Sequence, residues 1–131
     1  MNSEKTTQKK KSTALSNGKE YIIDAKGKRL GRVATEAASV LLGKNTTHFA
    51  KNFVEPITVK ITNASLLDIS EKRGTEEFQR YSGYPGGRNV ETLIHLGKRR
   101  GYGEVVRRVI NGMLPKNKLQ KQRMLNLEVT E

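Results

Sequence analysis

Residues 57–62 constrain the fold most strongly, because they alternate strictly between apolar and polar side chains. They read Ile-Thr-Val-Lys-Ile-Thr, and a period of two residues is typical of a strand with one buried face. A second β-rich run, Tyr-Ile-Ile at residues 21–23, ends at Asp24 before a turn that contains Gly27. The sequence therefore predicts two strands that belong to one sheet.

The segment between these strands has the spacing of an amphipathic helix. Apolar side chains recur every three or four positions, at Leu30, Val33, Ala34, Ala37 and Leu41. Gly43 is placed to end this helix, because glycine tolerates the left-handed conformation of a C-terminal cap. A strand, a glycine turn, a helix and a second strand predict an α/β unit.

The second half of the chain predicts two more helices. Residues 66–69 are compatible with a short strand or one helical turn, and residues 82–87 form a loop by composition. A short helix around residues 90–94 is expected to end at Gly97. An apolar stripe then marks a longer helix, whose members are Val105, Val106, Val109, Ile110 and Met113. We expect Val109 and Ile110 to be buried, and the element order favours an α/β sandwich over a helical bundle.

The excess positive charge lies at the two ends of the chain. The 131 residues include 25 Lys and Arg against 13 Asp and Glu, a net charge of +12. Residues 1–19 hold five lysines and one glutamate, and they are predicted to be a disordered basic tail because they cannot bury apolar area. Residues 98–123 hold nine basic residues and one acidic residue. We expect one α/β domain over residues 20–131, with charge at its ends that is typical of nucleic-acid binding.

A cationic segment follows the last predicted helix. Gly112 and Pro115 predict the end of that helix, since glycine caps it and proline cannot continue it. Residues 116–123, here called the basic strap, then contain three lysines and Arg123 and no acidic residue. Such a strap predicts a polyanionic partner. Charge alone also allows a basic tail that is merely solvated.

Residues 81–88 form a loop that suits an unpaired nucleobase. They read Tyr-Ser-Gly-Tyr-Pro-Gly-Gly-Arg, and glycine lets a ligand approach the backbone closely. Unpaired RNA bases stack on tyrosine rings, and arginine pairs with phosphate. A surface turn with one tyrosine packed into the core is the alternative.

Several kinds of chemical site are excluded or unsupported. Cysteine is absent, which rules out disulfides and thiolate metal sites and fits a reducing, intracellular compartment. His48 and His95 have no neighbouring residues at metal-ligand spacing. The Gly43-Lys44 pair fails as a phosphate-binding loop, because Ala38 and Asn45 occupy positions that require Gly and Ser or Thr. No nucleophile–base pair stands out. We therefore expect no metal, no cofactor, no small-molecule substrate and no enzymatic activity.

Membrane insertion and secretion are also not expected. No apolar run approaches the roughly 18 residues that span a bilayer. The first 19 residues lack the apolar stretch of about 7–15 residues found in a secretory signal. A cytoplasmic protein is the expectation.

Six motifs occur in an order that resembles a known family. They are residues 21–25, Gly27 with residues 30–32, residues 42–44, residues 61–64, residues 81–87 and residues 112–116. In this order they resemble bacterial ribosomal protein thirteen of the large subunit, the L-thirteen family. The combination of the tyrosine–glycine loop with Gly-Met-Leu-Pro-Lys is specific. Glu20, the less basic residues 75–80 before the tyrosine loop and the lack of a histidine-containing C-terminal extension depart from the family pattern. The last of these departures does not touch the main RNA-facing motifs.

The resemblance implies a fold, a function and partners. The expected fold is a three-layer α/β sandwich around a mainly parallel four-stranded sheet, with basic N- and C-terminal extensions. The expected function is that of a structural constituent of the large ribosomal subunit, which binds large-subunit ribosomal RNA and supports subunit assembly in the cytoplasm. Neighbouring large-subunit proteins are expected partners. A nucleotide-dependent enzyme and a general single-strand-binding module are the competing classes.

The candidate RNA-binding residues are the basic side chains of the strap, of the predicted helices and of their flanking turns, together with the tyrosine loop. They are Lys28, Arg29, Arg32, Lys44, Tyr81, Tyr84, Arg88, Lys98, Arg99, Arg100, Arg107, Arg108, Lys116, Lys118, Lys121 and Arg123. Such cations neutralise phosphates where RNA helices approach each other, while the tyrosines hold unpaired bases.

Overall fold

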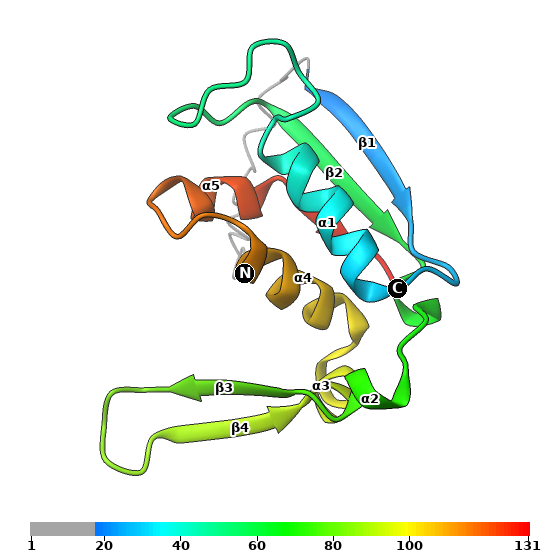
Figure 1. The fold of residues 1–131 in the computed structure, drawn as a ribbon, viewed down its shortest axis with the longest axis vertical. Coiled ribbons are helices and arrows are strands. Elements are labelled where there is room, and N and C mark those ends of the chain that lie inside the picture. Colours follow the sequence, from blue (N-terminus) through cyan, green and yellow to red (C-terminus); the bar gives the residue numbers. More distant parts are fainter. Residues whose placement is uncertain (1–17) are drawn as a thin grey trace, which may run out of the picture.

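The fold is a parallel sheet covered by helices, from which an antiparallel hairpin projects (Figure 1). The computed structural model describes residues 18–131. Its strands are β1 (Lys19–Asp24), β2 (Ile57–Thr62), β3 (Glu77–Tyr81), β4 (Arg88–Thr92) and β5 (Leu127–Val129). Its helices are α1 (Leu30–Leu41), the single 3-10 turn η1 (Ala64–Leu66), α2 (Glu71–Gly74), α3 (Leu93–Arg100), α4 (Tyr102–Met113) and α5 (Leu119–Leu125).

The parallel sheet has the strand order β1-β2-β5. Val59 of β2 lies between Tyr21 of β1 and Leu127 of β5, and both strand pairs are parallel. Helix α1 provides the crossover that parallel neighbours require. The predicted α/β class and the mainly parallel sheet are therefore confirmed, and β2 has the bounds that the alternation at residues 57–62 indicated.

Only one face of this sheet carries the core among the described residues. Ile57, Val59 and Ile61 are buried, and α1 and α4 pack together on that side. On the opposite face Ile22 is 71% exposed, and Lys60 Nζ lies 3.2 Å from Glu20 Oε1 and 4.0 Å from a Glu128 oxygen. Residues 18–131 therefore form two layers, a three-stranded sheet and the helices on one of its faces. This corrects the predicted three-layer sandwich around a four-stranded sheet.

Strands β3 and β4 form a separate sheet of their own. They pair antiparallel, from Glu77 opposite Thr92 to Tyr81 opposite Arg88. Most of their side chains are exposed, and only Phe78 and Glu91 are half-buried. A strand with polar side chains on both faces cannot enter a buried parallel sheet. The hairpin therefore stands away from the body as an arm (Figure 1).

Helix α3 begins and ends later than the sequence indicated. Val90 belongs to β4, and Thr92 caps the helix by accepting the backbone N–H of His95 at 3.4 Å. Gly97 does not end the helix but lies buried within it, where an added Cβ would meet the Tyr102 ring at 2.7 Å. The helix ends instead at Gly101, whose φ of +88° suits glycine.

Helix α4 contains the predicted apolar stripe, with one correction. Val105, Val106 and Ile110 are fully buried, but Val109 is only half-buried because it lines a surface cavity. The helix continues through Gly112 to Met113, so Pro115 rather than the glycine limits it.

The N-terminal boundary also differs slightly from the prediction. Lys19 pairs with Ile57 in β1, so it belongs to the body and not to the tail. Of the rest of the predicted tail, Gly18 directly precedes the strand and residues 1–17 lie outside the described residues.

Candidate nucleic-acid interface

The basic strap contains a short helix rather than an extended tail. Asn117 Oδ1 accepts the backbone N–H groups of Leu119 and Gln120, both at 3.1 Å, and so starts α5. Gln120 Nε2 donates to the carbonyl oxygen of Asn111 at 2.6 Å, which ties the strap back to α4. The three lysines of the strap are Lys116, Lys118 and Lys121, and all three are exposed. None of them lies within 4.0 Å of a carboxylate of residues 18–131.

Arg123 is not a surface cation, which corrects its place among the phosphate-binding candidates. Its side chain is 1% exposed, and its terminal NH2 nitrogen donates to the carbonyl oxygens of Lys51 and Phe53 at 3.3 and 3.5 Å. Its Nε and other terminal nitrogen have no hydrogen-bond partner in the structure. Because α5 is helical, position 123 shares the inner face with Leu119, one turn earlier.

Both tyrosines of the hairpin loop are exposed. Tyr81 is 67% exposed and Tyr84 is 75% exposed, so the alternative of a tyrosine packed into the core is wrong. The loop closes through two backbone hydrogen bonds, from Ser82 N–H to Gly87 O and from Gly87 N–H to Tyr84 O. Gly83 and Gly86 have φ values of +91° and +74°, so the turn needs glycine at both positions. The tip therefore presents aromatic rings on a closed loop.

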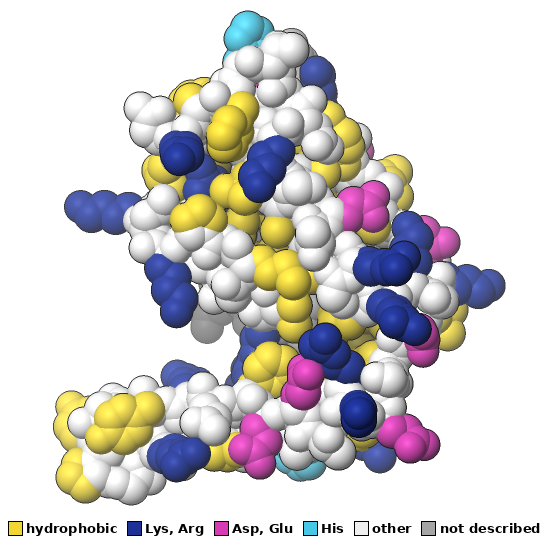
Figure 2. Space-filling model, viewed as in Figure 1, with side chains coloured by type: hydrophobic (Ala, Val, Ile, Leu, Met, Phe, Trp, Pro, Cys, Tyr) yellow, Lys and Arg dark blue, Asp and Glu magenta, His cyan; other side chains and the backbone are white. Residues whose placement is uncertain are grey.

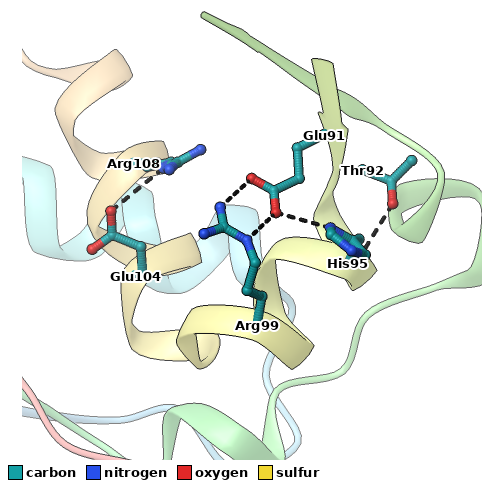
Figure 3. Close-up of polar contacts among 6 residues, drawn as sticks. All are labelled: Glu91, Thr92, His95, Arg99, Glu104 and Arg108. Atoms are coloured by element: carbon teal, nitrogen blue, oxygen red, sulfur yellow. Dashed lines mark hydrogen bonds and ion pairs between the residues drawn. The ribbon is translucent and has the colours of Figure 1, made fainter. Parts of the chain in front are cut away.

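The base of the hairpin is fixed by a polar network around Glu91 (Figure 3). The Arg99 Nε and NH2 groups each donate to one Glu91 oxygen at 2.7 Å, and His95 Nδ1 lies 2.9 Å from Glu91 Oε1. The paired hydrogen bonds from Arg99 lower the pKa of Glu91 to about 2, against the opposing effect of burial, and the His95 hydrogen bond adds to the decrease. The same pair raises the pKa of Arg99. Glu91 thus stays ionised and joins β4 to α3.

Arg108 joins the other strand of the hairpin to α4. Its Nε lies 3.4 Å from Glu104 Oε1 (Figure 3), and its guanidinium carbon lies 5.9 Å from the centre of the Phe78 ring on β3. Such a cation over an aromatic face is attractive. Arg99 and Arg108 therefore hold the hairpin to the helices, in addition to any role toward RNA that the sequence predicts for them.

The basic residues at the start of α1 stand beside a cavity. Lys28, Arg29 and Arg32 are exposed, and Lys28 Nζ lies 4.0 Å from Glu36 Oε2. Arg29 and Arg32 line a cavity of about 540 Å³ between α1, α2, β3, α3 and α4, here called the α1 cavity. Neither has a carboxylate within 4.0 Å in the described part of the chain.

The predicted residues do not converge on one small site. The hairpin lies at one end of the body and the connection between α1 and β2 at the other, with the strap between them (Figure 1); Lys44 belongs to that connection. Figure 2 shows a notch between the hairpin and the helices, with Lys and Arg side chains on both sides of it. The remaining candidates are exposed cations on the hairpin, α3 and α4: Arg88, Lys98, Arg100 and Arg107. Such a spread suits a large polyanion better than a small ligand.

The connection between α1 and β2 holds exposed aromatic side chains that the sequence analysis missed. Phe49 is 42% exposed and Phe53 is 57% exposed, next to exposed His48 and Lys51. The interleaving of aromatic and basic residues in His-Phe-Ala-Lys-Asn-Phe is the signal that points to them. The backbone of this connection is held by Arg123.

Residues 18–131 contain no group of three His, Cys, Asp or Glu side chains that could hold a metal ion. Over the same residues no helix is both long and apolar enough to cross a membrane.

Comparisons with known proteins match the whole body. Residues 18–131 match the family described as Ribosomal protein L13. Large ribosomal subunit protein uL13 of Trichormus variabilis is 39% identical over 110 residues, which cover 83% of this chain and 72% of the relative. The same-named protein of Synechococcus sp. strain CC9311 is 41% identical over 83% of this chain and 73% of its own length. The same-named protein of Prochlorococcus marinus is 40% identical over 86% of this chain and 75% of its own length. The chain belongs to the ribosomal protein L13 family, a family of ribosomal components and not of enzymes.

Proposed function

We propose that this protein is a structural constituent of the large ribosomal subunit, binds large-subunit ribosomal RNA and supports subunit assembly in the cytoplasm. The observation that carries the proposal is the set of exposed cations on separate segments that lack a carboxylate within 4.0 Å among the described residues. They include the strap lysines, Arg29 and Arg32 at the start of α1, and Lys98 and Arg100 in the last turn of α3. Unpaired cations on a folded body attract a polyanion and release its counterions on binding. The relatives carry the name large ribosomal subunit protein.

In this proposal the two exposed regions act differently on RNA. Lysines of the strap neutralise phosphates, which positions the body without reading bases. Tyr81 and Tyr84 stack on unpaired bases, because their rings are exposed on a closed glycine turn. The outer sheet face, with its Glu20–Lys60–Glu128 cluster, is closer to neutral and suits a neighbouring large-subunit protein better than RNA.

Sedimentation of ribosomes tests the placement in the subunit. We expect the full-length protein to sediment with large subunits and to remain bound after a high-salt wash, because buried contacts are screened less than surface charges. Binding of purified protein to large-subunit ribosomal RNA should be tighter than to an unstructured single strand of the same length. Release from the subunit in moderate salt, together with equal affinity for both RNAs, would favour a general single-strand-binding module instead.

A further inference from the structure

The α1 cavity has an apolar floor that no part of the described chain covers. Leu30 and Leu93 are buried at its bottom, while Met113 is 43% exposed. Three further apolar side chains line it and are half-buried, namely Ile69, Phe78 and Val109. The volume of about 540 Å³ lies in the range of about 300–1,000 Å³ that is typical of ligand sites. The floor is therefore large enough for a flat, apolar group.

The rim of the α1 cavity favours an anion. Three arginines and two carboxylates line it: Arg29, Arg32, Arg73, Asp68 and Glu76. Arg73 is paired with Glu76 at 3.1 Å, whereas Arg29 and Arg32 have no carboxylate within 4.0 Å, so the cations outnumber the carboxylates. At the start of α1 no side chain caps the backbone N–H groups and no acidic residue lies in the first turn. Among these groups, Arg32 N–H donates to the carbonyl oxygen of Arg29 at 3.0 Å. Gly31 leaves this end open, since a Cβ added there would meet no atom within 4 Å.

We propose that the α1 cavity holds one unstacked nucleotide of the bound RNA. The base lies on the apolar floor near Phe78, and its phosphate lies against Arg29 and Arg32. An extruded base is held between aromatic and apolar side chains in this way, and arginine pairs with phosphate. An apolar side chain of a protein partner would fill the floor but leave the two arginines without an anion. The proposal rests on the RNA binding proposed above and names a new site for it.

Adenosine monophosphate is a suitable probe, because it joins a base to a phosphate. Binding to the full-length protein is measured by NMR chemical-shift perturbation, with adenosine and inorganic phosphate as its separate halves. We expect the perturbed amides to be those of residues that line the cavity, and each half to bind more weakly than the whole. Perturbations confined to residues away from the cavity, or no binding of the nucleotide at all, would overturn the proposal.

Gly31→Leu tests the cavity itself. Gly31 lines the cavity, has no positive φ and has free space around its missing side chain, so the variant should fold and fill part of the volume. Gly112→Leu is the matched control, because Gly112 is also helical, also has no atom within 4 Å of an added Cβ, and does not line the cavity. We expect Gly31→Leu alone to weaken the binding of both adenosine monophosphate and ribosomal RNA about tenfold. The salt dependence of RNA binding should not change, because no cation is removed.

The double variant Arg29→Gln/Arg32→Gln separates the phosphate from the base. It should weaken binding of adenosine monophosphate about tenfold or more and leave adenosine unaffected, since only the charge-assisted hydrogen bonds are lost. Lys26→Gln/Lys72→Gln removes the same charge at two exposed residues that do not line the cavity. This control should change the binding of neither adenosine monophosphate nor adenosine.

The two proposals fail differently. If the parent does not bind large-subunit ribosomal RNA, the proposed function fails and the nucleotide site fails with it. If the parent binds RNA and Gly31→Leu binds it as tightly as Gly112→Leu does, only the nucleotide site is wrong. If the Gly31→Leu protein no longer joins the subunit but binds ribosomal RNA with normal affinity, the nucleotide site is also wrong. The cavity would then hold a side chain of a protein partner.

Discussion

The hairpin and the basic strap both extend from the same helical body, but they are attached to it by different forces. At the hairpin base Glu91 binds Arg99 through two hydrogen bonds of 2.7 Å, and Arg108 lies over Phe78. The strap is held by the burial of Leu114 before it and of Arg123 within α5, and by hydrogen bonds from Gln120 and Arg123 to backbone carbonyl oxygens. Side-chain contacts of two arginines therefore fix the hairpin, while packing and hydrogen bonds to backbone carbonyls hold the strap.

This difference matches what each region presents to solvent. The hairpin presents aromatic rings, and stacking depends on the orientation of a ring. The strap presents lysines, whose ammonium groups act as point charges on flexible stems. The arginine contacts where the hairpin joins the body fix the orientation of its tip, whereas the strap has only to bring its charge near a partner.

The largest expected effect comes from the helix that supports both regions. Ile110 of α4 is fully buried, so Ile110→Asp places an unpaired charge in the core and should destabilise the fold by roughly 4 kcal/mol or more. Asn111→Asp introduces the same charge at the next, exposed position and should change stability by about 0.5 kcal/mol or less. Thermal or urea unfolding measures both. Equal melting of the two variants would mean that α4 is not the common support.

Replacing the strap lysines should change the salt dependence of RNA binding. Each phosphate contact contributes roughly −0.7 to −0.9 to the slope of log K against log salt. Substituting Lys116, Lys118 and Lys121 together with Ser should make the slope shallower by about 2 units if all three make contact. Lys26, Lys60 and Lys72 changed together to Ser provide the control for net charge. A folded strap variant with the parental slope would mean that the strap is only solvated.

Tyr84→Ala should have the opposite signature. Loss of a stacked ring weakens RNA binding by roughly 1–3 kcal/mol, while the salt slope stays nearly constant because no charge is removed. Tyr84→Phe keeps the ring and should bind almost as the parent does. Binding curves at several salt concentrations distinguish the cases. A loss of affinity in Tyr84→Phe as large as in Tyr84→Ala would show that the hydroxyl, not the ring, makes the contact.

The smallest effect is expected from acid titration of the hairpin base. The pKa of Glu91 falls from 4.5 to about 2 on folding, so its contribution to stability is present above pH 4.5 and is lost as the pH falls toward 2. In Glu91→Gln this contribution is absent at every pH. The difference in melting temperature between parent and Glu91→Gln should therefore shrink over this interval. A difference that stays constant down to pH 2 would mean that the ionised carboxylate does not hold the hairpin.

The sequence predicted the buried parts of the fold well. The strand at residues 57–62 alternates because its neighbours bury one face, and the helix from Leu30 to Leu41 has a continuous apolar stripe. Strands β3 and β4 were missed because exposed side chains on both faces leave no period of two to detect. Strand β5 has only three residues, too few for a pattern.

The candidate site was predicted as a set of residue types but not as an arrangement. Composition identified the exposed lysines and the tyrosine loop, since exposure follows from polarity and from turn glycines. It did not identify Arg123 as buried, because that depends on α5, whose single inner turn is too short to show a stripe. It also missed the α1 cavity, because its lining comes from five elements that only the tertiary fold brings together.

The position of β5 in the sheet has a consequence for how the protein folds. Central strand β2 pairs with β1 through a local crossover, but its other neighbour is the last strand in chain order. Thr130 donates its backbone N–H to Ile61 O across 69 sequence positions. Contacts between residues so distant in sequence slow folding, because the intervening chain must be ordered before they form. During synthesis the sheet edge of β2 therefore stays open until the C-terminal strand has emerged.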